Sequence, residues 1–249
     1  MTDIFTYALE DGVAVIRWDL PGASMNVLTL EGAEELAACL DRAFADEGAK
    51  GVVITSAKPD FAGGMDLKTL ARLRAGAGSD PAKTLFDFVM TLHGVLRRIE
   101  LGGGDPKTGK GAKPVAWACP GTAMGIGLEI GLACHRRFAA DNPKARIGLP
   151  EVKVGLFPGA GGTTRLIRML GVMGAAPYLL EGKTPNPKKA KSGGLVDEVA
   201  APDDLLAAAK AWAAEAGETA ARKPWDQKGY RIPGGGPYHP AGFQTFLGG

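Results

Sequence analysis

The chain has 249 residues, of which 45% are hydrophobic, so it can bury a full core. Its 29 Lys and Arg nearly balance its 27 Asp and Glu, which argues against the basic field that sequence-independent nucleic-acid binding requires. Cys39, Cys119 and Cys134 lie in apolar surroundings without CxxC spacing, so neither a disulfide framework nor a metal site is expected. There is no basic leader followed by an apolar stretch and no apolar run of about 18 residues, which favours a cytoplasmic protein without a membrane span.

The first half of the chain predicts strands that alternate with helices. Residues 4–9 and 13–18 are β-branched or aromatic segments separated by Glu10-Asp11-Gly12, which predicts a hairpin. Residues 28–45 have apolar positions at helical spacing, and residues 51–55 are typical of a buried strand.

The same rhythm continues downstream. Helices are predicted near residues 85–98 and 126–134, and strands at residues 114–119 and 137–140. Repeated strand–helix units favour an α/β fold. A further helical region is expected over residues 202–221.

Two polar segments rich in glycine and proline interrupt this pattern, at residues 101–111 and 223–249. The first lacks the GxxxxGK[ST] spacing of a phosphate loop, so a surface insert is the better interpretation. The second contains Trp225, Tyr230 and Tyr238, which suggests an extended segment that packs on a surface.

A carboxylate lies within the glycine-rich segment Gly121-Thr-Ala-Met-Gly-Ile-Gly-Leu-Glu-Ile-Gly-Leu-Ala-Cys134. The neighbours of Glu129 at helical spacing are small or apolar, so it is expected to face the protein interior. Two explanations stay open: an interaction with the helix dipole, or catalysis. The glycines favour the second, because they let a ligand approach free N–H groups at the helix start.

A second carboxylate, Glu151, lies in Gly148-Leu-Pro-Glu-Val-Lys-Val-Gly-Leu-Phe-Pro-Gly-Ala-Gly-Gly-Thr163, between a proline and a strand-like run. Taken alone, it is equally well an exposed turn residue. Glu129 and Glu151 are 22 positions apart (151 − 129), so they cannot share one helix face. Nothing in the residues alone indicates that the two carboxylates lie close together in the fold.

These two blocks together resemble the signature of the enoyl-CoA hydratase/isomerase (crotonase) superfamily. Upstream, Asp60-Phe-Ala-Gly-Gly-Met-Asp-Leu67 resembles the first oxyanion segment of that superfamily, and the resemblance extends from about residue 12 to residue 200. The segment that begins Pro224-Trp225-Asp226 resembles the linker of the multifunctional fatty-acid oxidation α-subunits, so the likeness is greatest to their N-terminal hydratase part.

The resemblance implies a crotonase-type β-β-α spiral, an α/β fold with a short helical and linker-like C-terminal tail. It implies a hydratase core over residues 1–200, followed at 201–249 by a helical segment and a Pro/Gly-rich linker. The dehydrogenase region that follows this linker in the multifunctional enzymes is expected to be absent, so we expect the chain to be a piece of a larger enzyme.

The resemblance also implies the roles of individual residues. The backbone N–H groups of Met65 and Ile126 hold the thioester oxygen, Glu129 takes a proton from water, and Glu151 gives a proton to the α-carbon. The implied CoA and substrate contacts are Asn26, Ala62, Gly63, Gly64, Asp66, Gly125, Pro158 and Gly159. From the residues alone, Asn26 is also explained as a turn or helix-cap residue, and the loop of residues 159–162 as a simple helix start.

The chain departs from the superfamily pattern in three places. Ile126 stands where glycine is usual and Met65 where alanine is frequent, which suggests a differently shaped pocket beside the thioester. His135 replaces the usual Asp after the motif cysteine, and both His135 and His93 are interpreted as surface or packing residues.

The implied function is hydration of 2-enoyl-CoA in fatty-acid β-oxidation, a lyase reaction. A 3,2-enoyl-CoA isomerase and an inactive acyl-CoA-binding module remain as alternatives. The acyl-CoA is substrate rather than cofactor, and no GxGxxG segment with a following acid predicts an NAD site. Implied partners are a second copy of the chain, a downstream 3-hydroxyacyl-CoA dehydrogenase region and a thiolase subunit.

Overall fold

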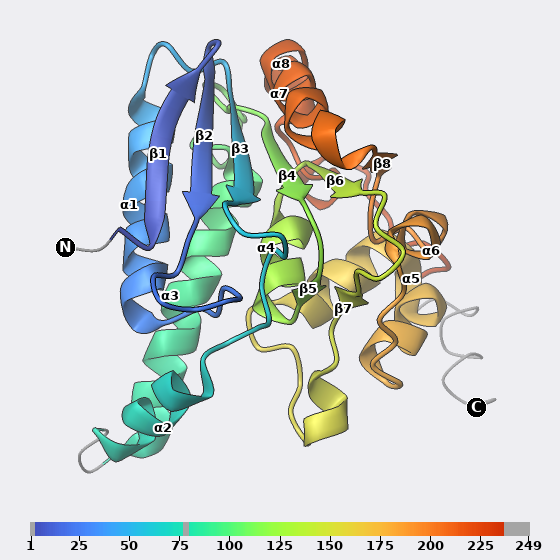
Figure 1. Cartoon of the computed structure of the whole chain (residues 1–249). Helices are drawn as coiled ribbons and strands as arrows, with labels where there is room; N and C mark the ends of the chain where they lie inside the picture. Colours follow the sequence, from blue (N-terminus) through green and yellow to red (C-terminus); the bar gives the residue numbers. More distant parts are fainter. Residues whose placement is uncertain (1–2, 77–79, 237–249) are drawn as a thin grey trace.

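The computed structural model describes residues 3–76 and 80–236. A six-stranded sheet in the order β1-β2-β3-β4-β6-β8 forms its centre, and a second sheet pairs β5 with β7 (Figure 1). Only β1 and β2 are antiparallel among these described strand pairs. The strands are β1 (Phe5–Glu10), β2 (Val13–Trp18), β3 (Gly51–Ser56), β4 (Val115–Cys119), β5 (Ala123–Met124), β6 (Arg136–Ala140), β7 (Ile147–Gly148) and β8 (Glu198–Ala200).

The helices cover both faces of the larger sheet (Figure 1). The α-helices are α1 (Leu30–Ala45), α2 (Leu67–Ala75), α3 (Pro81–Leu101), α4 (Ile126–Ala133), α5 (Gly162–Leu179), α6 (Pro187–Ser192), α7 (Leu205–Glu215) and α8 (Gly217–Ala220). Short 3-10 helices are η1 (Glu151–Val154), η2 (Pro202–Asp204) and η3 (Pro224–Asp226).

The predicted hairpin is confirmed. Glu10 of β1 pairs with Val13 of β2, and the two residues between them, Asp11 (φ 51°) and Gly12 (φ 76°), are left-handed. A two-residue turn of this kind matches the twist of the flanking strands, which explains a glycine at the second position.

Side chains alternate between two cores along the strands. In β2, Ile16 and Trp18 face the larger core together with α1, α3 and α4, whereas Val13 and Val15 face the opposite side. Both faces of the mainly parallel sheet are therefore buried, as such sheets require. The larger core contains Phe61, whose ring contacts Trp18 edge-on.

Helix α7 covers the second face through Leu205, Ala209 and Ala213, which recur every four residues and are buried against the sheet. The approach is close, because a Cβ atom at Gly51 would lie 2.1 Å from the carbonyl oxygen of Ala213. Glycine at the start of β3 therefore lets this helix pack directly on the strand.

Three local expectations need correction. The helix expected at residues 85–98 begins earlier, because Asp80 caps it and Pro81 suits its first position. Helix α2 was not predicted; the side chain of Asp66 caps it by accepting from the N–H groups of Lys68 and Thr69. The strand-like run after Glu151 forms the 3-10 helix η1, which ends at a left-handed Gly155 (φ 74°).

The described part of the C-terminal segment packs on its own chain. The Tyr230 hydroxyl donates to the carbonyl oxygen of Arg168 in α5, and the Asp226 carboxylate pairs with Arg97 in α3. Glycine is needed at Gly171, where a Cβ would lie 2.1 Å from the carbonyl oxygen of Pro233. Tyr238, which was also expected to pack, lies outside the described residues.

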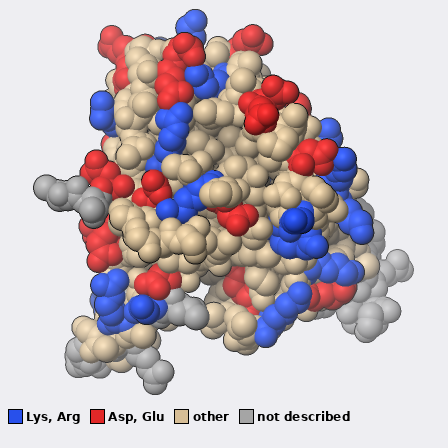
Figure 2. Space-filling view, viewed as in Figure 1, with Lys and Arg blue, Asp and Glu red and all other residues tan. Residues whose placement is uncertain are grey.

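Surface charge follows the near-balanced composition. Acidic and basic side chains are interspersed on the face shown in Figure 2. Within residues 3–76 and 80–236, no helix is long and apolar enough to cross a membrane.

Candidate active site

Glu129 lies in the first turn of α4, a helix whose eight residues are all buried. Its side chain faces the interior as expected, with the residue only 2% exposed. Oε1 accepts hydrogen bonds from the backbone N–H groups of Ala160 (2.9 Å) and Gly162 (2.8 Å). Its donors thus come from the turn that leads into α5, whose first residue is Gly162, and not from its own helix, so the dipole of α4 does not account for its placement.

Glu151 reaches the start of the same helix from η1. Its Oε1 lies 3.0 Å from the position that a Cβ on Gly125 would occupy, so only glycine leaves room there. Its Oε2 is buried and, within the described part of the chain, has no hydrogen-bond partner. The fold therefore joins two carboxylates that the sequence alone left apart.

The two carboxylates share an environment that disfavours negative charge. Burial raises the pKa of Glu129 to about 7, the charge of Glu151 adds to the rise, and the N–H groups and Arg165 oppose it. Burial also raises the pKa of Glu151 above its ordinary range. Two neighbouring carboxyls of this kind tend to hold one proton between them.

Two backbone N–H groups lie beside this pair, at Met65 and at Ile126. The segment that carries Met65 is held against β5, where Ala62 bridges Ala123 and accepts from Met124 N–H at 2.9 Å. Ile126 is the first residue of α4, where N–H groups lack helical partners. No carbonyl in the described residues accepts from either N–H group.

The approach of the two segments depends on glycine. A Cβ at Gly125 would lie 3.6 Å from the Cα of Gly64, and Gly125 has φ 56°, a conformation that side chains disfavour. Gly64 has φ 117°. The expected donors Met65 and Ile126 each follow one of these glycines directly, so the structure brings both to the carboxylates.

Asn26 does not offer its side chain to a ligand. It is fully buried; its Oδ1 accepts from Leu20 N–H at 2.8 Å and its Nδ2 lies 3.0 Å from the Phe61 carbonyl oxygen. It is not a helix cap either, since Thr29 caps α1. Its backbone carbonyl accepts from Gly63 N–H at 2.8 Å, so Asn26 ties the expected CoA-binding segments together.

The remaining expected contact residues fall on two loops. Ala62, Gly63 and Gly64 precede α2, where the Asp66 side chain is used as the cap. Pro158 and Gly159 precede α5. The second loop holds Glu129, a role that sequence reasoning missed, since it assigned this loop to substrate contact or to a plain helix start.

Sequence reasoning also missed Arg165, Glu100 and the contact of His93. Arg165 donates to the Ala160 carbonyl oxygen at 2.8 Å and to Glu100 at 2.9 Å, and both side chains are buried. His93 Nε2 lies 2.7 Å from the carbonyl oxygen of Gly159. Glu100 lies just beyond the helix predicted at residues 85–98, so its burial had no signal in that prediction.

His135, which was interpreted from sequence as a surface or packing residue, is a packing residue. Its Nδ1 accepts from Val115 N–H at 2.9 Å and its Nε2 lies 3.0 Å from the Glu100 carbonyl oxygen. Burial lowers its pKa to about 3, so the ring is neutral. Among the residues that the structure describes, no group of three or more His, Cys, Asp or Glu could hold a metal ion.

Sequence comparison identifies relatives of the chain. Residues 107–223 match the family described as Enoyl-CoA hydratase/isomerase. The fatty acid oxidation complex subunit alpha of Shewanella loihica is 37% identical over 217 residues, which cover 87% of this chain and 28% of that protein. The chain spans little more than a quarter of the length of such curated relatives, between 26% and 28%.

Solved structures show the same fold. An enoyl-CoA hydratase from Bacillus anthracis is 29% identical with a TM-score of 0.70, over 84% of this chain and 75% of that one. DspI of Pseudomonas aeruginosa is 26% identical with a TM-score of 0.73, over 99% of this chain and 92% of that one. Together with the motif order, these likenesses establish that the chain belongs to the enoyl-CoA hydratase/isomerase (crotonase) superfamily.

Proposed function

We propose that this chain hydrates 2-enoyl-CoA thioesters by syn addition, giving 3-hydroxyacyl-CoA. The observation that carries the proposal is the pair of buried carboxylates, Glu129 and Glu151, beside two N–H groups that no described carbonyl engages. Hydration needs one group that removes a proton from water and one that delivers a proton to carbon, and the pair supplies both.

The environments of the two carboxylates support different roles. Hydrogen bonds to a carboxylate favour its charged form. Glu129 has two such donors, so it is the better base, whereas the Oε2 of Glu151 has none among the described residues and suits a protonated acid.

In the proposed reaction, Glu129 takes a proton from water as the hydroxyl oxygen bonds to the β-carbon. The electrons of the double bond move onto the thioester oxygen, where the N–H groups of Met65 and Ile126 stabilise the developing charge. Glu151 then gives its proton to the α-carbon. The proton has moved from Glu151 to Glu129, and its return resets the pair. Each such N–H donor contributes ~3–4 kcal/mol in comparable oxyanion sites.

The wider context is proposed from the relatives. Relatives of 37–38% identity are named as α-subunits of a fatty acid oxidation complex, which supports a role in fatty-acid oxidation within a complex. A dehydrogenase region, a thiolase subunit and a cytoplasmic location are part of the proposal and come from the family resemblance alone. Addition of water changes no oxidation state overall, so the proposed reaction needs no NAD and no other redox cofactor.

The alternative is 3,2-enoyl-CoA isomerisation, which needs one carboxylate to move a proton between two carbons. The presence of Glu151 beside Glu129 favours the hydratase. The test is incubation of the chain with crotonyl-CoA in ¹⁸O-labelled water, followed by mass analysis of the thioester. Hydration gives a product one labelled water heavier, and a 3-enoyl-CoA substrate reports isomerisation by the appearance of the absorbance of the conjugated 2-enoyl thioester. Binding of crotonyl-CoA without either product would overturn both activities.

A further inference from the structure

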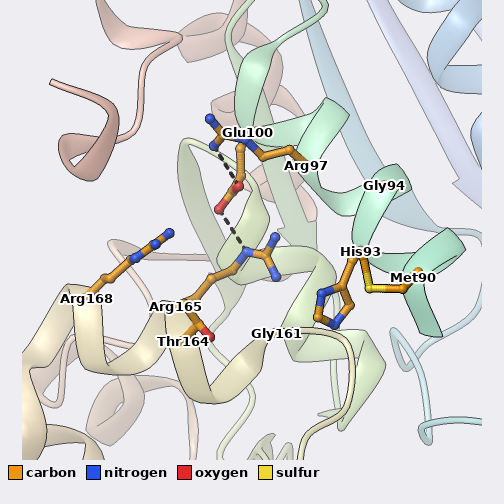
Figure 3. Close-up of a pocket in the computed structure, with 9 residues that line it drawn as sticks. All are labelled: Met90, His93, Gly94, Arg97, Glu100, Gly161, Thr164, Arg165 and Arg168. Atoms are coloured by element: carbon orange, nitrogen blue, oxygen red, sulfur yellow. Dashed lines mark hydrogen bonds and ion pairs between the residues drawn. The ribbon is translucent and has the colours of Figure 1, made fainter. Parts of the chain in front are cut away.

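A series of charged side chains connects the C-terminal segment to the active site. Both carboxylate oxygens of Asp226 accept from the Arg97 guanidinium, each at 2.8 Å. Arg97 also donates to Oε2 of Glu100 at 2.9 Å, and Oε1 of Glu100 accepts from Nε of Arg165 at 2.9 Å. We call these four residues the Asp226–Arg165 network; three of its members lie on α3 and α5, as Figure 3 shows.

Arg165 joins this network to the turn that holds Glu129. Its Nη1 donates to the Ala160 carbonyl oxygen at 2.8 Å, and a Cβ on Gly161 would lie only 2.5 Å from the same nitrogen. The N–H groups of Ala160 and Gly162 both point at Oε1 of Glu129. The guanidinium therefore holds the peptide unit that lies between the two peptide units whose N–H groups orient the carboxylate.

Packing alone does not fix this turn, because a cavity of about 390 Å³ lies beside it. Its lining includes His93, Arg97, Glu100, Gly161 and Arg165 (Figure 3). On that side the turn is held by hydrogen bonds: Arg165 binds the Ala160 carbonyl, and His93 Nε2 binds the Gly159 carbonyl at 2.7 Å.

The two members nearer the turn are more buried than the two farther from it. The Glu100 and Arg165 side chains are 3% and 8% exposed, whereas those of Asp226 and Arg97 are 18% and 39% exposed. Removing one partner of a buried ion pair is strongly destabilising. Variants at the exposed end therefore test the network without the loss of the fold expected from variants at the buried end.

We propose that the Asp226–Arg165 network positions the catalytic carboxylate of Glu129, so that a residue of the C-terminal segment sets the geometry of the active site. The inference rests on the proposed hydratase function. Its four members are positioning residues, since none of them contacts the carboxylate by a hydrogen bond in the described structure. The charged groups that act on Glu129 are Glu151 and Arg165.

The test compares Asp226→Asn, Arg97→Gln and the double variant in the full chain. Each is expected to lower kcat for crotonyl-CoA roughly 10-fold with KM within about twofold, because small displacements of a catalytic group cost rate rather than binding. The double variant should be no worse than the worse single variant, since both interrupt one connection. A merely structural role predicts the same non-additivity in the free energy of unfolding but an unchanged kcat in the folded variants, so kcat is the deciding readout.

A second readout reports on Glu129 directly. Its carboxyl is titrated by NMR in chains labelled with ¹³C-glutamate, and the signal is assigned as the one missing from Glu129→Gln. Because the N–H donors and Arg165 favour the ionised form, loosening the turn should move the titration midpoint to higher pH. The acid limb of kcat/KM should move with it.

Glu218→Gln is the matched control, because it removes another carboxylate of the C-terminal region whose contact is the N–H of Gly111. It should leave kcat and the Glu129 midpoint unchanged. If the Asp226→Asn and Arg97→Gln chains are folded and keep the wild-type kcat and the wild-type titration midpoint of Glu129, the proposal that the network positions Glu129 is wrong. If the wild type does not hydrate crotonyl-CoA but the midpoint still moves in both variants, the function is wrong and the network stands.

Discussion

Glu129 shows how competing effects act on one side chain. Burial disfavours its charge and outweighs two N–H donors and the Arg165 guanidinium, so its pKa is raised to about 7. An ionised carboxylate in this place is therefore a cost to folding, and it is also the form that the proposed reaction uses. Residues at catalytic sites commonly show such a conflict between stability and activity.

This conflict predicts the pH dependence of Glu129→Gln stability. A folded-state pKa near 7 lies above the ordinary value of 4.5, so wild-type stability falls as the pH rises from about 4.5 through 7. The amide that replaces the carboxyl does not titrate, so the variant should gain on the wild type over this range, by up to ~3 kcal/mol at pH 8. Urea unfolding at pH 5 and pH 8 measures the difference. Glu34→Gln, at an exposed residue of α1, should show no comparable change between the two pH values.

A second prediction concerns the backbone donor at Ile126. Proline is tolerated at the first position of a helix, so Ile126→Pro should leave α4 folded while removing the N–H. Turnover of crotonyl-CoA should fall ~10²–10³-fold, whereas Ile126→Ala should keep activity within about threefold. Circular dichroism checks that both variants are folded. Equal losses in the two variants would show that the N–H group is not used.

At the scale of elements, the Asn26 side chain connects the ends of β2 and β3 with the loop that follows β3. Its side chain lies within hydrogen-bond distance of the carbonyl oxygens of Trp18 (3.1 Å) and Phe61 (3.0 Å), and of Oγ of Ser56 (3.0 Å). With Leu20 N–H, these contacts secure the loop that carries the Met65 N–H group.

Asn26→Ala should therefore lower the free energy of unfolding by about 3 kcal/mol, because it leaves several buried polar groups without partners. The same variant should raise KM for crotonyl-CoA, since the loop at residues 62–66 loses its support. Ser24→Ala, at an exposed neighbour, is the control and should change stability by less than about 0.5 kcal/mol. A stable Asn26→Ala chain would mean that these hydrogen bonds contribute little.

The boundaries of helices and strands could be predicted from the sequence where nearby residues determine them. The hairpin and the strands at residues 13–18 and 51–55 were predicted because turn residues and β-branched runs agree there, and the second strand extends one residue further, to Ser56. Helix α2 was missed because its start depends on one side-chain cap, and η1 because three alternating apolar and polar residues also suit a strand.

At the scale of the molecule, the meeting of Glu129 with Glu151 could not be predicted from spacing. It depends on β5 and β7 pairing in parallel, which brings Gly148 to Met124 and so places the residues that follow each strand side by side. The turn at residues 159–162 leads into α5 and lies about 30 positions after Glu129 in the chain. Apart from its glycines, nothing in the sequence indicated that it contacts Glu129. The family resemblance implied the roles of the two carboxylates, and their relative positions follow from contacts between segments far apart in the sequence.

The measurement that tests the central claim most directly is crotonyl-CoA turnover by the wild type, Glu129→Gln and Glu151→Gln, with binding of the thioester measured in parallel. Loss of either carboxyl should lower kcat ~10²–10⁴-fold and change the dissociation constant by less than about threefold, because each acts on protons and neither anchors the nucleotide. An active wild type with either single variant near its rate would contradict the two-carboxylate mechanism.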